Sequence, residues 1–357
     1  MNFTIFGYPK SGKTTLFNLL TGAKIETAPH EKSRKEPNQR TCPVPDPRLD
    51  QLSELYPDLA KHYASIEYSD LAGLSYGEVR NATYLSHLRK ADGLTHVVRG
   101  FMDPQISHHR DTPNPREDIT SMEEELILTD LISVEARLEK LEKELMRSKD
   151  LEGEQEKEIL LHIHAHLEKG FALREFPFSP AEEKLTRSFA FLSQKALLHM
   201  INVDESDISL IENPEKICLE TGKGTAVQAF CGKIESEILE LEGEEKDLFL
   251  EEYGLRQLSA PKFLKASYNL LEVITFFSIG KEEIRAWTIK KNTNAVTAAG
   301  VIHTDIQKGF IRAEVIPFKE LLLLGSLQSA REKGSVRLEG KDYIIQDGDV
   351  VYFRFSP

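Results

Sequence analysis

The chain has 357 residues, a length that predicts more than one domain, and its formal net charge at pH 7 is -13. This acidic balance excludes a protein that coats nucleic acid over its whole surface. Its three cysteines are scattered without metal-ligand spacing, which indicates a reduced, cytoplasmic setting. No apolar run approaches the roughly 20 residues of a membrane span, so no membrane association is expected.

Strand-like and helical patterns alternate from residue 1 to about residue 118. The strand-like runs read NFTIF, SIEYSDL and LTHVVRGF. Such alternation predicts a mainly parallel sheet covered by helices. The same pattern returns in KALLHMINVDESD, so we expect residues 1–118 and 195–274 to form one α/β nucleotide-binding domain.

A different pattern interrupts this domain. Apolar residues recur at intervals of three and four, first at Leu131, Val134, Leu138, Leu141 and Leu145 and again at Leu160, Ile163 and Leu167. One helix cannot bury such a seam by itself, so residues 119–194 are predicted to contain an antiparallel helical hairpin. Further along, Ser179, Pro180 and Glu182 predict a capping box at the start of another helix.

The last part of the chain, residues 275–357, is predicted to be a small α+β domain. Its strand-like runs are ITFFSIG, EIRAWTI, FIRAEVI and YIIQDGDVVYFRF, separated by Gly-rich turns. It holds 12 lysines and arginines against 10 aspartates and glutamates. This part is therefore the better candidate for RNA contact, although a mixed surface without a ligand fits equally well. For Trp287 and the neighbouring phenylalanines, the alternating pattern favours a core role over base stacking.

The segment GYPKSGKT, residues 7–14, matches the phosphate-loop pattern G-x-x-x-x-G-K-[ST] between a strand and a helix. The glycines let the backbone curl so that its N–H groups point at phosphates. Lys13 can reach the β- and γ-phosphate oxygens, and the Thr14 hydroxyl can ligate Mg²⁺. The helix that follows adds its N-terminal dipole to the anion site.

Two further segments extend this site. DLAGL places Asp70 at the end of a strand, where it can hold Mg²⁺ through water, and Gly73 where its N–H can reach the γ-phosphate. NVDE, residues 202–205, occupies the place of the Asn-Lys-x-Asp guanine motif. Glu205 is one methylene longer than the usual aspartate, and Val203 replaces the lysine. Guanine specificity should therefore be weak, and adenine becomes a suitable base.

Together these segments resemble the YchF-type branch of the Obg-related P-loop GTPases, over nearly the whole chain. PVPDPRLDQL, EEELILTDL, VIHTDIQKGFIRAEVI and LEGKDYIIQDGDVVYFRF are also close to the family pattern. The resemblance implies a P-loop NTPase domain with a mainly parallel sheet. It also implies an inserted α-helical coiled-coil hairpin and a C-terminal TGS domain of the ubiquitin-like β-grasp type.

The resemblance also implies that Gly12, Lys13, Thr14 and Thr15 hold the phosphates and that Asn202 and the backbone of Val203 hold the base. The same loops add Lys10 and Ser11 as candidate phosphate contacts, with a solvated loop position as the alternative for Lys10, and Glu205, Cys231 and Gly232 as candidate base-side contacts. The motifs themselves predict Lys13 and Gly73 as the catalytic groups and Thr14 and Asp70 as the Mg²⁺ ligands.

Two positions argue for slow hydrolysis. Leu74 stands where Ras-like proteins keep a water-orienting glutamine, and a leucine cannot orient water. In the first switch, KSRKEPN carries Arg34 where family members have a threonine that closes on Mg²⁺. These departures affect the hydrolytic step more than binding.

We therefore expect a cytoplasmic nucleotide switch that prefers ATP to GTP and associates with ribosomes or ribosomal RNA through its helical and TGS domains, without stable DNA binding. Two alternatives stay open at this point. One is a nucleotide-binding scaffold that does not hydrolyse its ligand, and the other is a GTP-specific Obg-like GTPase.

Overall fold

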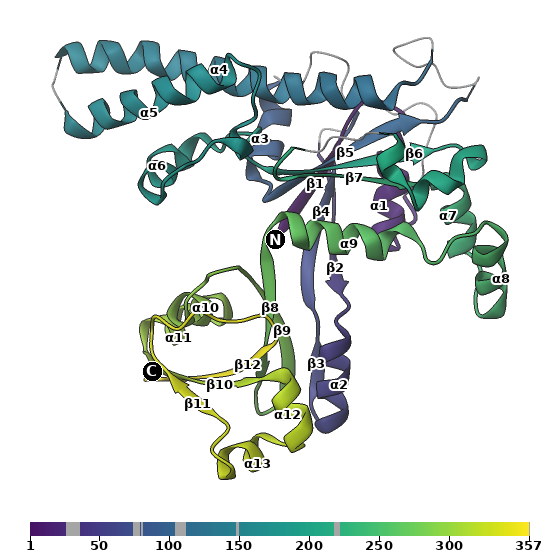
Figure 1. The fold of residues 1–357 in the computed structure, drawn as a ribbon, viewed down its shortest axis with the longest axis vertical. Helices are drawn as coiled ribbons and strands as arrows, with labels where there is room; N and C mark the ends of the chain where they lie inside the picture. Colours follow the sequence, from purple (N-terminus) through teal and green to yellow (C-terminus); the bar gives the residue numbers. More distant parts are fainter. Residues whose placement is uncertain are drawn as a thin grey trace. The chain divides into compact units, whose positions relative to one another are not determined.

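The computed structural model describes residues 1–25, 36–73, 79, 81–103, 112–147, 150–217 and 222–356. Contacts divide the chain into two compact units, both visible in Figure 1. The N-terminal unit contains Met1–Arg40 and Glu67–Leu270, and the C-terminal unit contains Thr41–Ile66 and Leu271–Pro357.

A six-stranded sheet forms the centre of the N-terminal unit, in the order β2-β4-β1-β5-β6-β7. The strands are β1 (Asn2–Phe6), β2 (Asn38–Val44), β4 (Ala64–Asp70), β5 (Gly93–Gly100), β6 (Ala196–Val203) and β7 (Thr225–Phe230). β1 pairs in parallel with β4 and β5, and β5, β6 and β7 follow in parallel. The predicted parallel α/β sheet is confirmed.

Helices and short 3-10 turns connect these strands. They are α1 (Lys13–Thr21), α3 (Ala82–Lys90), α4 (Pro115–Arg147), α5 (Leu151–Leu167), η1 (Leu173–Glu175), α6 (Pro180–Thr186), η2 (Arg187–Phe189), η3 (Glu205–Ile211), η4 (Pro214–Lys216), α7 (Gly232–Leu239), α8 (Glu244–Glu252) and α9 (Ser259–Leu270). In the described part of the chain, no helix is both long enough and apolar enough to cross a membrane.

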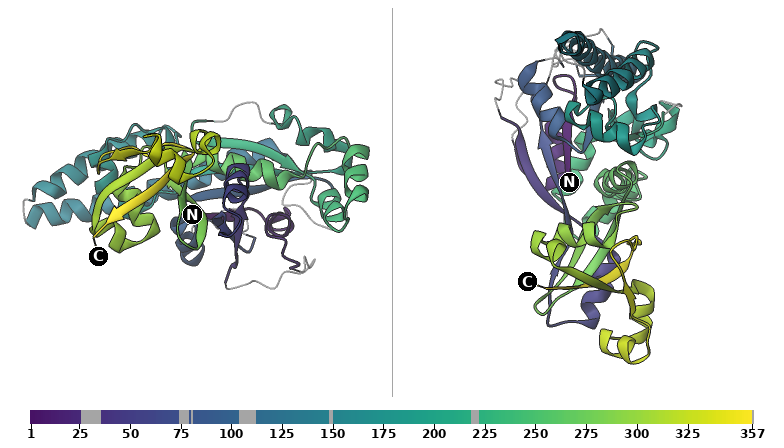
Figure 2. Two further views of the ribbon diagram at one scale, coloured as in Figure 1. Left: turned by 90° about the horizontal axis from the view of Figure 1, so that it is seen from below. Right: turned by 90° about the vertical axis from the view of Figure 1, so that its left-hand side faces the viewer.

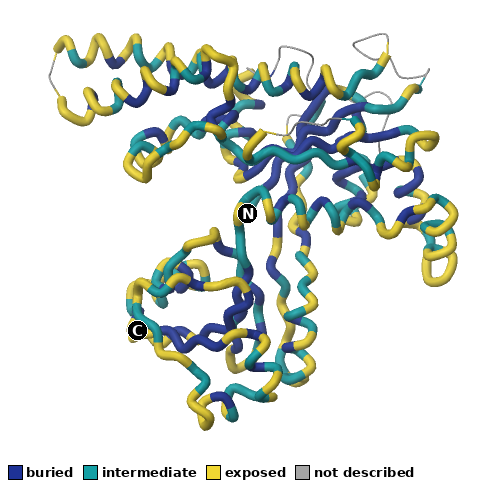
Figure 3. The backbone as a smooth tube through the Cα atoms, in the orientation of Figure 1, coloured by how far each residue is buried: buried dark blue, intermediate teal, exposed yellow. Residues whose placement is uncertain are grey.

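The central strands of the sheet are buried on both faces, as continuous apolar strands require. Seven of the eight residues of β5 are buried, and Figure 3 shows the central strands in the buried colour. One core cluster joins Phe6 and Leu94 in the sheet to Met122 on α4. Phe263 on α9 makes edge contacts with the rings of Phe3 and Tyr68.

The helical hairpin is confirmed. α4 and α5 lie side by side in Figures 1 and 2 and share one apolar cluster. Its buried members include Val134, Leu141, Leu160 and Ile163, all from the predicted seam. α5 begins at Leu151, and Asp150 is its N-cap residue, with a side chain that accepts a hydrogen bond from the N–H of Glu152.

The capping box at the start of α6 is also confirmed. The backbone N–H of Ser179 donates to Glu182 Oε2 at 2.7 Å, and the N–H of Glu182 donates to Ser179 Oγ at 3.3 Å. Pro180 occupies the first helical position. These contacts satisfy two N–H groups that a helix start otherwise leaves unpaired.

The C-terminal unit contains a second six-stranded sheet, in the order β11-β10-β12-β8-β9-β3. Its elements are α2 (Pro47–Leu55), β3 (Ala60–His62), β8 (Val273–Ile279), β9 (Glu283–Lys290), α10 (Ala295–Ile302), α11 (Thr304–Lys308), β10 (Phe310–Pro317), α12 (Phe318–Leu324), α13 (Leu327–Glu332), β11 (Arg337–Glu339) and β12 (Asp349–Phe355). The predicted small α+β domain is confirmed. Trp287 is partly buried against its core and donates from Nε1 to Ser278 Oγ at 2.8 Å, as the core role requires.

Residues 41–66 differ from the expected domain boundary. The sequence pattern assigned them to the nucleotide-binding domain, whereas their contacts place them in the C-terminal unit. β3 pairs with β9, and Leu49 and Leu52 of α2 are fully buried in the same cluster as Phe277. The polar strand AKH gives no sequence signal of this pairing. The division into three domains otherwise stays a prediction.

The hairpin seam can be tested with two adjacent leucines. Leu160 is fully buried, whereas Leu161 is 49% exposed. We expect Leu160→Ala to lower the free energy of unfolding by about 2–5 kcal/mol, because it removes buried contacts and leaves a cavity. Leu161→Ala should change it by less than about 0.5 kcal/mol. Urea denaturation followed by circular dichroism measures the difference, and equal effects would contradict the seam.

Candidate nucleotide-binding site

The segment between β1 and α1 has the backbone of a phosphate-binding loop. Gly7 and Gly12 adopt φ angles of 140° and 102°, which side chains rarely allow. A Cβ on Gly12 would also lie 2.3 Å from Asn202 Nδ2. Lys10 takes the left-handed conformation at φ 60° and lies half-buried in the same loop. The chain therefore curls tightly just before α1 begins.

Lys13 is the first residue of α1 and is only 3% exposed. Its Nζ donates to the backbone carbonyl of Tyr8 at 2.8 Å, which holds the ammonium group over the loop. Ser11 Oγ is also buried and has no hydrogen-bond partner in the part of the chain that the structure describes. A buried hydroxyl of this kind is suited to a polar ligand at the loop.

A hydroxyl and a carboxylate meet beside the loop. Thr14 Oγ1 donates to Asp70 Oδ2 at 2.9 Å, and Asn38 Nδ2 donates to the same oxygen at 3.1 Å. α1, β4 and β2 supply these three side chains. Hard oxygen ligands at the end of a phosphate loop fit Mg²⁺. The sequence pattern assigned both Thr14 and Asp70 to Mg²⁺. It placed Asn38 at the end of the first-switch segment KSRKEPN but did not predict its contact with Asp70.

Within the described residues, no group of three or more His, Cys, Asp or Glu side chains is arranged to hold a metal. Thr14 and Asp70 stay the predicted ligands of Mg²⁺, and their hydroxyl and carboxylate oxygens suit this ion.

Gly73, in the DLAGL segment, lies directly against the phosphate loop. A Cβ built on Gly73 would lie 2.6 Å from Pro9 Cα and 3.1 Å from Lys13 Nζ. The backbones approach so closely that a side chain at this position has no space. The two sequence segments, about 60 residues apart, thus form one surface.

Asn202, at the end of β6, binds the phosphate loop from the side where the base is predicted to lie. Its Nδ2 donates to the Ser11 carbonyl at 3.2 Å, and its Oδ1 accepts from the Gly232 N–H at 2.9 Å. Thr15 lies next to the same glycine, because a Cβ on Gly232 would approach Thr15 Cγ2 to 3.0 Å. The Asn202 amide thus joins the phosphate loop to the start of α7. A direct contact between Asn202 and a base stays a prediction.

The remaining base-side residues lie at the ends of β6 and β7. The side chain of Val203 is buried, so the backbone N–H and C=O of this residue are the groups suited to contact a ligand. Glu205 is exposed and pairs with Lys233. Cys231 is 1% exposed, and burial raises the pKa of its thiol, so it is not a reactive thiolate.

One buried carboxylate of this region was missed by sequence reasoning. Glu235 Oε2 accepts from the N–H and the hydroxyl of Ser259, both at 2.7 Å, and Oε1 accepts from the Cys231 N–H at 3.3 Å. Glu235 therefore fixes the loop that follows β7 to the start of α9. Its place on the helix α7, amid other acidic residues, gave no signal of burial.

The prediction of slow hydrolysis depends on Arg34 in the first switch and on Leu74 at the end of DLAGL. Both residues lie outside the described part of the chain. The expectation of slow hydrolysis therefore stays a prediction.

The close approach at Gly73 gives a direct test of this surface. Gly73→Ala places a methyl group against Pro9, so we expect it to displace the loop and weaken nucleotide binding at least about tenfold. Gly340→Ala is the matched control, since its new Cβ would meet nothing closer than 3.6 Å. Calorimetric titration with Mg·ATP compares the two variants. Unchanged affinity in Gly73→Ala would show that this contact does not shape the site.

Two models of known protein domains match this chain. A domain model described as a 50S ribosome-binding GTPase matches residues 2–129. A model of the YchF GTPase C-terminal domain, described as a protein of unknown function, matches residues 273–356.

Full-length relatives and a solved structure are also similar. "Ribosome-binding ATPase YchF" of Bacillus subtilis is 41% identical, with 99% of this chain and 98% of that protein covered. "Obg-like ATPase 1" of Oryza sativa subsp. japonica is 33% identical, covering 99% and 91%. The solved YchF GTPase of Schizosaccharomyces pombe superposes with a TM-score of 0.83 at 28% identity, covering 99% and 97%. With its phosphate loop, inserted hairpin and C-terminal unit all accounted for, the chain belongs to the YchF family of P-loop NTPases.

Proposed function

We propose that the protein binds a purine nucleoside triphosphate with Mg²⁺ at the loop of residues 7–14 and hydrolyses it slowly, as a ribosome-associated switch. The observation that carries this proposal is the meeting of Thr14 with Asp70 beside the buried ammonium of Lys13. A cation, a hydroxyl and a carboxylate at the start of one helix form a complete set of groups for Mg²⁺-triphosphate.

Each group has its own task. Lys13 and the N–H groups of the loop bind the phosphates and stabilise the negative charge that builds up as the terminal phosphate is transferred. Thr14 and Asp70 hold Mg²⁺, which when bound neutralises charge on the phosphate oxygens. The N–H of Gly73 contacts the terminal phosphate and signals its presence to the DLAGL segment. Leu74 stands in place of a glutamine and cannot orient water, which keeps hydrolysis slow.

The base-side residues support a preference for ATP. Guanine recognition needs a carboxylate that accepts two donors from the base edge. Glu205 is one methylene longer than the usual aspartate, and its carboxylate already pairs with Lys233. Two of the relatives reported above are themselves named ATPases.

Ribosome association is proposed from the relatives, several of which are named as ribosome-binding. Of the three predicted domains, the helical hairpin and the TGS domain would make this contact. The nucleotide-binding domain would bind the nucleotide. A cytoplasmic location follows from such a partner.

Parallel titrations test the ligand. Calorimetry with Mg·ATP and Mg·GTP should show tighter binding of ATP. Lys13→Ala should weaken ATP binding by about 10- to 100-fold, because a hydrogen bond to a charged group contributes about 1.5–3 kcal/mol. Lys90→Ala, at an exposed position on α3, is the control. A preference for GTP of more than tenfold would overturn the role given to Glu205.

Single-turnover measurements test the enzymatic step. Phosphate release from bound ATP should occur at a rate of the order of 10⁻⁴ to 10⁻² s⁻¹, the range of P-loop enzymes without a stimulating partner. Asp70→Asn should slow it further, since one ligand of Mg²⁺ loses its charge. If no phosphate is released with or without ribosomes, the protein binds nucleotide but is not an enzyme.

A further inference from the structure

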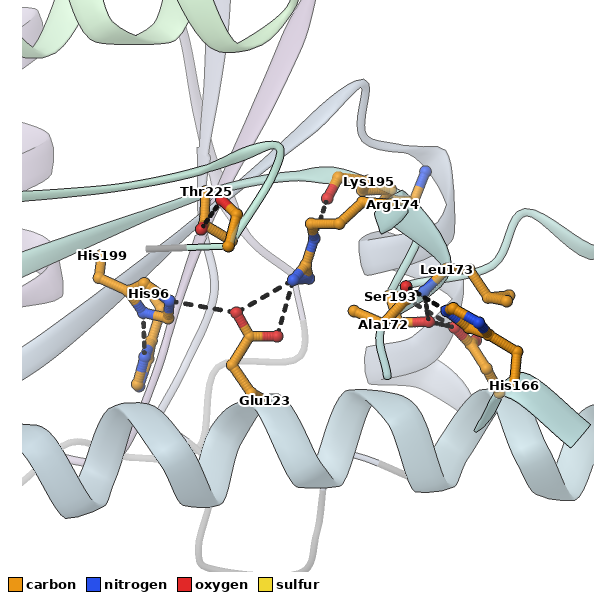
Figure 4. A network of polar contacts seen from close by, with 12 residues as sticks. His96, Glu123, His166, Ala172, Leu173, Arg174, Ser193, Lys195, His199 and Thr225 are labelled. Atoms are coloured by element: carbon orange, nitrogen blue, oxygen red, sulfur yellow. Dashed lines mark hydrogen bonds and ion pairs between the residues drawn. The ribbon is translucent and has the colours of Figure 1, made fainter. Parts of the chain in front are cut away.

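Two buried histidines lie side by side in the central sheet, behind the phosphate loop. His96 on β5 and His199 on β6 are direct register partners and are 0% and 2% exposed. Their Nδ1 atoms are 3.1 Å apart, as Figure 4 shows. The role proposed above for the nucleotide site uses neither of them.

His96 supports the start of the phosphate loop. Its ring lies 5.4 Å from that of Phe6 and meets the ring of Tyr8 edge-on at 6.3 Å. A Cβ built on Gly7, between those two residues, would lie 3.2 Å from His96 Cδ2. The Tyr8 carbonyl in turn accepts the hydrogen bond from Lys13 Nζ. A shift of the His96 ring would therefore displace the backbone at the start of the phosphate loop.

On its other side the histidine pair reaches both ends of the helical hairpin. His199 Nε2 lies 3.4 Å from Glu123 Oε1 on α4. Both carboxylate oxygens of Glu123 accept from Arg174 Nη1, at 3.0 and 2.8 Å. Glu123 lies near the start of α4, the first helix of the hairpin, and Arg174 on η1 follows α5, so one ion pair ties the two ends together (Figure 4).

The ring of His96 is neutral, because burial first, and then the neighbouring His199 and Lys13, keep its pKa well below the usual value. A neutral imidazole donates from one ring nitrogen and accepts at the other. In the contact between the two Nδ1 atoms one ring therefore donates and the other accepts, so the two rings hold a directional hydrogen bond.

Stability alone is a poor explanation for the Glu123–Arg174 pair. The Arg174 side chain is only 4% exposed, and the cost of removing two charges from water offsets most of their attraction. Such a pair does, however, fix one geometry, because its two hydrogen bonds are directional.

We propose that His96, His199, Glu123 and Arg174 couple nucleotide binding at the phosphate loop to the ends of the helical hairpin, with His199 and Glu123 as positioning residues. The proposal rests on the nucleotide-binding function proposed above. Because coupling between two sites is reciprocal, a partner that holds the hairpin would change nucleotide affinity by the same factor.

Hydrogen exchange of the full chain, read by mass spectrometry with and without Mg·ATP, tests the coupling. In the unmodified protein, ATP should slow exchange both in α1 and at the hairpin ends, residues 119–126 and 172–176. In His199→Phe, which keeps a buried ring but loses both nitrogens, α1 should still be protected. Protection at the hairpin ends should fall by at least about fivefold, the lower range of measured couplings.

Glu123→Gln is the second variant. It keeps the size of the side chain but removes its charge, and it decides the question if His199→Phe does not fold. We expect the same loss of protection at the hairpin ends. His62→Phe, at an exposed histidine of β3, is the control and should behave as the unmodified protein does.

The outcomes separate the two proposals. Protection of α1 without any effect at the hairpin ends of the unmodified protein overturns the coupling and leaves nucleotide binding intact. Full protection at the hairpin ends in a folded variant overturns it as well. If ATP protects neither region in the unmodified protein, the proposed function fails, and the coupling fails with it.

Discussion

The side-chain amide of Asn202 holds the nucleotide-binding surface together. It donates to the carbonyl of Ser11 and accepts from the N–H of Gly232, so it ties the phosphate loop to the start of α7. The loop can lie this close only because Gly12 has no side chain, since a Cβ there would overlap the amide. One glycine and one asparagine, 190 residues apart, thereby bring β1 and β6 into a single site.

The inserted hairpin is attached to the same sheet by buried polar contacts. Besides Glu123, α4 presents Asp130, whose oxygens accept from the N–H of Leu192 at 2.9 Å and from the N–H of Ser193 at 2.7 Å. Burial raises the pKa of Asp130 to about 6, and the hydrogen bonds work against that rise. Directional hydrogen bonds therefore hold the end of the hairpin next to the sheet, while the apolar seam holds α4 and α5 together along their length.

The C-terminal unit contains a segment that is distant in the sequence, Thr41–Ile66. The guanidinium of Arg48 donates to Asp46 at 2.8 Å and to Asp347 at 2.7 Å, which anchors α2 to the loop before β12. Together with the buried leucines of α2, this contact completes the core of the unit. A segment inserted into one domain in the sequence can therefore belong to another in space.

The sequence by itself determined the parts whose signal is local. The phosphate loop, the strand before it and the hairpin seam follow from residue types at fixed spacing, because backbone sterics and helical periodicity act over a few residues. Segments as distant as Asp70 and Asn202 were also assigned to the site, from motifs at the ends of strands. Only the tertiary structure decided which distant side chains and strands meet: Asn38 on Asp70, β3 beside β9, and His96 against His199. Each depends on which strands become neighbours, and that choice is made by burial of the whole core rather than by any short stretch of chain.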